Sequence, residues 1–61
     1  MDEFDKQLVS QAQSLVVSKG YIAWSEIFEL SKKARSHEAT KIIDDILKYL
    51  NHLEEASLGM I

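Results

Sequence analysis

The 61-residue chain contains no cysteine and no proline, and glycine occurs at only two positions. Without cysteine, neither a disulfide nor a thiolate metal site can stabilise a small core. No linker divides the sequence, which predicts a single domain over residues 1–61. The sequence also lacks an apolar run long enough to span a bilayer, and its N-terminus lacks the basic-then-apolar pattern of a signal peptide. We therefore expect an intracellular protein, either cytoplasmic or located in the nucleus or nucleoid.

Apolar residues between Ala39 and Leu58 cover about half the circumference of a helix. At 100° per residue they fall within an arc of roughly 180°, whereas an ordinary surface helix needs only somewhat more than 100°. We expect this long C-terminal helix to contact two or more neighbours, to form the centre of the fold and to contact another chain. The positions in the arc are Ala39, Ile42, Ile43, Ile46, Leu47, Tyr49, Leu50, Leu53 and Ala56.

The sequence predicts three helices, near residues 3–19, 25–35 and 37–57. Gly20 fits the left-handed position that ends the first helix, and residues 21–24 are typical of a short extended connector. Ser25 and Ser36 are suitable N-caps for the second and third helices. Residues 34–37 also tolerate helix, so the second and third helices could be one bent helix. The expected core consists of Leu8, Ala12, Leu15, Ile27, Leu30, Ile43, Ile46, Leu50 and Leu53.

The first helix carries no charged residue between Gln7 and Ser18. Depletion of charge is typical of the centre of a protein interface, although a polar face can also be neutral without binding anything. A core of this size rarely provides more than ~3–5 kcal/mol unless the chain oligomerises. We therefore expect a homodimer or a tight complex with another protein. The expected partner interface consists of Gln7, Gln11, Ser14, Val17, Ser18, Ile43, Leu47 and Leu50.

Residues of catalytic or metal-binding type are not arranged for chemistry in this sequence. His37 and His52 stand 15 residues apart, and neither has a His or carboxylate at the i+4 spacing of helical metal ligands. Adjacent acidic residues on a helix diverge by about 100°, so Asp44 and Asp45 do not form a carboxylate pair. The two glycines are isolated and form no phosphate-binding loop. We expect no catalysis, no metal, no cofactor and no small-molecule substrate.

A basic segment interrupts an otherwise acidic chain. Residues 32–41 carry Lys32, Lys33, Arg35 and Lys41 against Glu38, whereas the whole chain has a net charge of −3. Lys41 also stands three and four residues before Asp44 and Asp45, the spacing of charge pairs on a solvated helix face. Because phosphate contacts dominate DNA affinity, the overall acidity favours the solvated face over a DNA-binding surface.

The order of helix, short connector, helix, turn and long helix, followed by LEEASLGMI at residues 53–61, resembles the helical part of a winged helix-turn-helix domain. The sequence has no glycine in the turn and stops at Ile61, where the wing would begin. The resemblance therefore implies an all-α, small three-helix bundle of helix-turn-helix type that lacks the wing or is part of a longer protein. In that family the third helix enters the major groove. The implied DNA contacts are Lys32, Lys33, Arg35, Ser36, His37, Thr40 and Lys41.

Three hypotheses follow from the sequence. The preferred one is a non-catalytic protein-interaction module or accessory subunit of a larger complex. The second is a dimeric DNA-binding helix-turn-helix protein. The third is a structural bundle in which the third helix pairs with its symmetry mate along a seam of heptad spacing, a spacing typical of helix pairing.

Overall fold

The computed structural model of the protein describes the backbone of residues 1–59 and the side-chain environments of residues 1–54. These residues form α1 (Glu3–Lys19), a 3₁₀ helix η1 (Gly20–Ala23), α2 (Trp24–Lys33) and α3 (His37–Gly59). Because residues 1–59 contain no strand, the expected all-α class is confirmed. The last two residues of the motif at 53–61, and the side chain of Ala56, lie outside the described part of the chain.

The ends of α1 agree with the sequence prediction. The Asp2 side chain accepts a hydrogen bond from the backbone N–H of Asp5 at 2.8 Å, which caps the first turn. The helix ends at Lys19, and Gly20 follows with a φ of 63°. Residues with a Cβ are strained at this positive φ. Gly20 therefore lets the chain leave α1 without strain.

The expected extended connector at residues 21–24 is wrong. Residues 20–23 form η1, and Trp24 is already the first residue of α2. Ser25 consequently lies inside α2, and the start of this helix has no side-chain cap. The β propensity of Tyr21 and Ile22 reflects how such side chains pack on a sheet. Here there is no sheet among the described residues, and the 3₁₀ turn instead buries Ala23 in the core.

The second and third helices are separate. Ala34 has an extended backbone, with φ −62° and ψ 138°, and it ends α2. Ser36 then caps α3, because its Oγ accepts a hydrogen bond from the backbone N–H of Ala39 at 3.1 Å. The predicted cap at Ser36 is confirmed, and the alternative of one bent helix is excluded.

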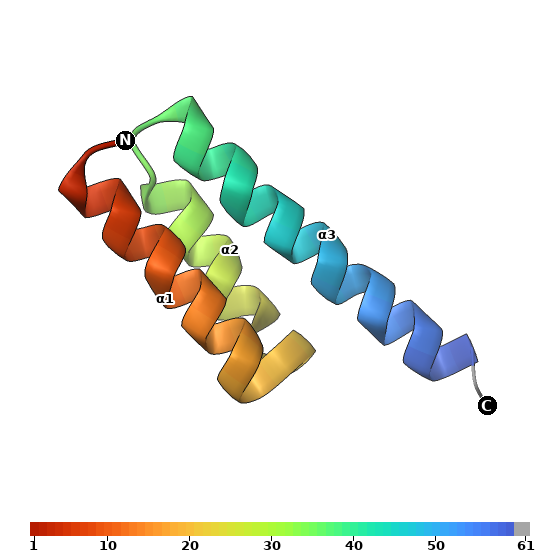
Figure 1. Ribbon diagram of the computed structural model, residues 1–61. Helices are drawn as coiled ribbons and strands as arrows, with labels where there is room; N and C mark the ends of the chain where they lie inside the picture. Colours follow the sequence, from red (N-terminus) through yellow and green to blue (C-terminus); the bar gives the residue numbers. More distant parts are fainter. Residues whose placement is uncertain (60–61) are drawn as a thin grey trace.

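Figure 1 shows how the helices are arranged. α1 and α3 both begin at the end of the molecule where the N-terminus lies, and α2 runs in the opposite direction. α3 has 23 residues, compared with 17 in α1 and 10 in α2. It contacts α1, η1 and α2, and it continues past their ends (Figure 1). The expectation that the C-terminal helix contacts more than one neighbour is therefore confirmed.

The core contains one buried cluster to which each of these elements contributes. Leu15 and Ile46, which were expected in the core, are only half-buried against it. Leu53 was expected to be buried but is 38% exposed, because α3 continues past the elements that would cover it (Figure 1). The buried apolar residues are Leu8, Val9, Ala12, Ala23, Ile27, Leu30, Ala39, Ile43, Leu47 and Leu50.

Candidate functional site

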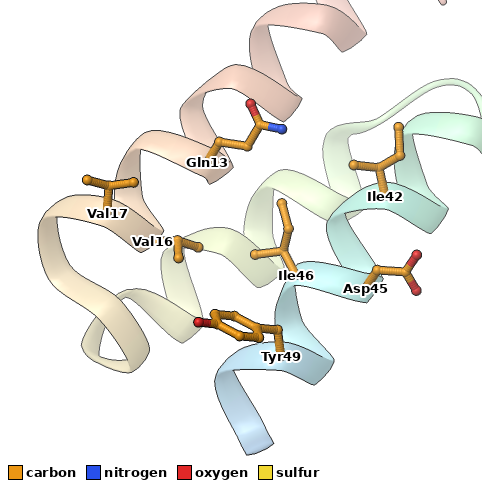
Figure 2. Close-up of a pocket in the computed structure, with 7 residues that line it drawn as sticks. All are labelled: Gln13, Val16, Val17, Ile42, Asp45, Ile46 and Tyr49. Atoms are coloured by element: carbon orange, nitrogen blue, oxygen red, sulfur yellow. The ribbon is translucent and has the colours of Figure 1, made fainter. Parts of the chain in front are cut away.

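An open apolar groove lies between the C-terminal half of α1 and the middle of α3. Its volume is about 460 Å³. Figure 2 shows Val16 of α1 beside Ile46 and Tyr49 of α3, with Asp45 on the outer side of α3. The groove exists because α1 and α3 touch through their buried faces but leave their outer edges apart. Its lining consists of Gln13, Val16, Val17, Ile42, Asp45, Ile46 and Tyr49.

Much of the apolar surface in the groove is in contact with solvent. Val17 is 88% exposed and Tyr49 is 54% exposed, while Ile42 and Ile46 are half-buried. Of the lining residues, Asp45 alone is charged. Contiguous apolar surface of this kind marks interaction sites more often than isolated exposed residues do. The groove is therefore the candidate functional site.

The α3 residues of the expected partner interface do not line the groove. Ile43 and Leu50 are completely buried, and Leu47 is 6% exposed. These side chains fill the core between α3 and its neighbours, so a partner cannot reach them in the folded chain. The prediction that they form the interface is wrong, because an arc of 180° does not indicate which of its edges faces the chain's own core.

The α1 part of the expected interface is divided between two surfaces. Val17 lies in the groove, whereas Gln11 and Ser14 line a smaller hollow between α1 and α2, together with Leu15, Glu26 and Leu30. Gln7 and Ser18 are exposed, and the Ser18 hydroxyl donates a hydrogen bond to the Ser14 carbonyl oxygen at 2.9 Å. The uncharged face of α1 is thus exposed, but only part of it adjoins apolar surface of α3.

The predicted contact residues of α3, which are Ile43, Leu47 and Leu50, each directly follow a residue that lines the groove. Ile42, Ile46, Tyr49 and Leu53 follow one another at spacings of four, three and four residues. This is the spacing of a helix-packing seam, and we call these residues the outer stripe of α3. All four residues belong to the apolar arc that the sequence indicates between residues 39 and 58. Only the positions of α1 and α2 distinguish the outer stripe from the buried one.

The start of α1 is attached to the turn between α2 and α3. The carboxylate of Asp5 accepts hydrogen bonds from the backbone N–H of Arg35 at 2.9 Å and from that of Ser36 at 2.8 Å. Asp5 is completely buried. The hydrogen bond from Arg35 is the largest cause of a lowered pKa of Asp5, although burial opposes it. Helical periodicity in the sequence does not indicate this contact, because the partners of Asp5 are about 30 residues away.

Two of the basic side chains near this turn lie over aromatic rings. The Arg35 guanidinium lies 4.4 Å from the centre of the Phe4 ring, and Lys32 Nζ lies 4.6 Å from that of Phe28. Trp24 is half-buried and stacks on Phe28 with ring centres 5.2 Å apart. These contacts cover apolar surface with charged side chains. Both Arg35 and Lys32 therefore already contact a side chain of their own chain.

The structure brings the seven candidate DNA-contacting residues to one end of the molecule but uses several of them internally. Ser36 caps α3, and the Thr40 hydroxyl donates to the Ser36 carbonyl oxygen at 3.1 Å. Both residues are half-buried. Lys33, His37 and Lys41 are exposed, and they form the remaining basic surface at this end.

Comparisons of the chain with protein-family models, curated proteins and solved structures gave no match. Within the described part of the chain, no three His, Asp or Glu side chains lie close enough together to hold a metal ion. None of the described helices combines the length and apolarity needed to cross a membrane.

Proposed function

We propose that this protein is a non-catalytic interaction module, a small accessory subunit that binds an apolar helix of a partner in the groove between α1 and α3. The scaffold that presents the groove is a three-helix bundle of helix-turn-helix type. The observation that carries the proposal is the exposure of Val17 and Tyr49 beside half-buried Ile42 and Ile46. No charged side chain from α1 lines this surface.

The spacing of the apolar residues along the groove supports a helix as the occupant. Amphipathic helices bind in apolar grooves through residues spaced three and four apart, and the outer stripe of α3 has this spacing. Burial of the groove would also add to the stability of a core that is small for an independent domain. A cation on the partner near Asp45 would meet the one charge on the groove wall.

A matched pair of substitutions tests the proposal. Val17→Lys places a charge in the groove, whereas Ile22→Lys changes a similarly exposed apolar residue of η1, 77% exposed, that does not line the groove. Immobilised wild-type protein and the Ile22→Lys variant should retain the same partner from a native extract, and Val17→Lys should lose it. Equal retention of the partner by both variants would contradict the proposal. A wild-type protein that neither self-associates nor retains any partner would also contradict it.

A second candidate function is DNA binding, which the exposed residues Lys33, His37 and Lys41 favour. In a helix-turn-helix protein, the N-terminal part of α3 would enter the major groove. Against this, the first turn of α1 packs on the same end through Phe4 and Asp5. The exposed acidic residues Asp2 and Glu3 would therefore lie near a DNA backbone bound there.

Titration with duplex DNA at low salt, where phosphate contacts are strongest, tests the alternative. If DNA is the ligand, Lys33→Ala and Lys41→Ala should each weaken binding for all sequences and reduce the slope of log affinity against log salt by about one. Absence of binding at low salt would eliminate this function.

A further inference from the structure

We infer that the helix bound in the groove is α3 of a second copy of this chain, in an antiparallel, twofold-symmetric dimer. This inference rests on the proposed function and names its partner. It differs from a seam along Ile43 and Leu50, because those side chains are buried within the chain itself.

The outer stripe is complementary to itself when two copies of α3 run in opposite directions. With the twofold axis midway between the levels of Ile46 and Tyr49, Ile46 meets Tyr49 of the second copy. In the same register, Ile42 meets Leu53 of the second copy. Every layer then joins an aliphatic side chain to another large apolar one. Symmetry repeats both contacts, so all four stripe residues of each copy are paired. A twofold interface of this kind contacts the same surface on both copies.

The charges beside the stripe favour the antiparallel direction. Asp45 and His52 are both exposed and stand seven residues apart, so they lie on the same edge of the outer stripe. Antiparallel pairing brings Asp45 near His52 of the second copy, and symmetry repeats this contact. In a parallel twofold pair the two Asp45 side chains would lie on opposite sides of the seam, and neither would lie near His52 of the second copy. The antiparallel dimer thus places an imidazole beside the one charged residue that lines the groove.

The wall formed by α1 is compatible with the second copy. Val16 and Val17 provide apolar surface beside the stripe, and Gln13 is uncharged. Since α1 carries no charge between Gln7 and Ser18, its groove edge repels neither Asp45 nor Lys48 of the incoming helix. The four helices α1, α3 and their symmetry mates would enclose the two grooves in one continuous apolar layer.

Sedimentation equilibrium over a concentration series is the first test. The wild-type protein and Ile22→Lys should shift from monomer to dimer with the same dissociation constant, and Val17→Lys should remain monomeric. Because Val17 is 88% exposed in the folded chain, this variant should keep the helical circular dichroism of the wild type.

A charge exchange between Asp45 and His52 tests the direction of pairing. Asp45→Lys places a cation near His52 of the second copy, and His52→Glu places a carboxylate near Asp45. Each single substitution should weaken the dimer roughly 3- to 10-fold, since exposed pairs contribute a fraction of a kcal/mol and the contact occurs twice. The double variant Asp45→Lys with His52→Glu should recover most of the wild-type affinity.

The outcomes separate this inference from the proposed function. A wild-type protein that is monomeric at every concentration overturns the homodimer. If that monomer still retains an extract protein through Val17, the groove binds another partner and only the identity of the occupant is wrong. A dimer that withstands Val17→Lys places self-association outside the groove and overturns the inference. A dimer whose double charge variant shows no recovery overturns the antiparallel register.

Discussion

The side chain of Asp5 and the backbone of Ser36 are 31 residues apart in the sequence, yet Oδ2 of Asp5 accepts a hydrogen bond from the Ser36 N–H at 2.8 Å. The other carboxylate oxygen accepts from the N–H of Arg35 at 2.9 Å. One buried carboxylate thereby joins the first turn of α1 to the start of α3. This contact helps to hold α1 and α3 side by side, and their common edge forms the groove.

Substitution of Asp5 should destabilise the fold strongly. Asp5→Asn keeps the size of the side chain but offers only one acceptor oxygen, so the backbone N–H of Arg35 or of Ser36 loses its partner at the buried Asp5 side chain. A buried donor without an acceptor is costly. We expect the unfolding temperature to fall by more than about 5 °C in a chain of this size. Thermal unfolding followed by circular dichroism measures this. Glu3→Gln, an exposed neighbour in the same turn, is the control and should have little effect.

The Asp5 contact should also make stability depend on pH. Since the pKa of Asp5 is lowered in the folded protein, its contribution is complete above the unfolded carboxyl pKa of about 3.9 and is lost as the pH falls through the lower, folded value. Urea unfolding of the wild type and Asp5→Asn should therefore differ most near neutral pH. The difference should shrink as the pH falls below about 4. A difference that grows in acid would contradict the role assigned to Asp5.

The boundary between the core and the outer stripe of α3 can be tested with two leucines. Leu50 is completely buried and Leu53 is 38% exposed. Leu50→Ala should reduce the free energy of unfolding by ~2–5 kcal/mol, which approaches the whole stability of a small domain. Leu53→Ala should reduce it by about 1 kcal/mol or less at protein concentrations where the chain is monomeric. Similar losses for the two variants in chemical denaturation would show that this boundary is misplaced.

The two serines that the sequence offers as N-caps should behave differently. Ser36→Ala removes the acceptor for the Ala39 N–H and should lower the free energy of unfolding by about 1 kcal/mol. Ser25 is exposed and lies within α2, whose start has no side-chain cap. Ser25→Ala should therefore change stability by less than about 0.5 kcal/mol. Denaturant titration of both variants gives the comparison, and an equal loss from each would argue against the observed start of α2.

Features encoded by neighbouring residues could be predicted from the sequence. The bounds of α1, the positive φ of Gly20 and the cap at Ser36 depend on residues within one turn of each other. The start of α2 could not be predicted this way, because the β propensity of Tyr21 and Ile22 was outweighed by the packing of Ala23 in the core. Burial in the core is a tertiary effect that local propensity does not contain.

The candidate site was predicted only in part, because its two walls come from distant segments. The sequence indicated surplus apolar surface on α3 and an uncharged face on α1, and Val17 does line the groove. Which edge of the apolar arc is exposed depends on where α1 and α2 pack. That arrangement depends in turn on long-range contacts such as the hydrogen bonds of Asp5 to Arg35 and Ser36. Helical periodicity alone could therefore not separate Leu47 and Leu50 from Ile46 and Tyr49.

The claim that the α1–α3 groove is the surface of association is tested most directly by methyl-resolved NMR spectra recorded over a concentration series. The account predicts progressive shifts of the methyl signals of Val16, Val17, Ile42 and Ile46 as the dimer forms. The signals of buried Ile27 and of exposed Ile22, which does not line the groove, should stay in place. Spectra that do not change with concentration, or shifts centred on Ile22 with the groove signals unmoved, would contradict the account.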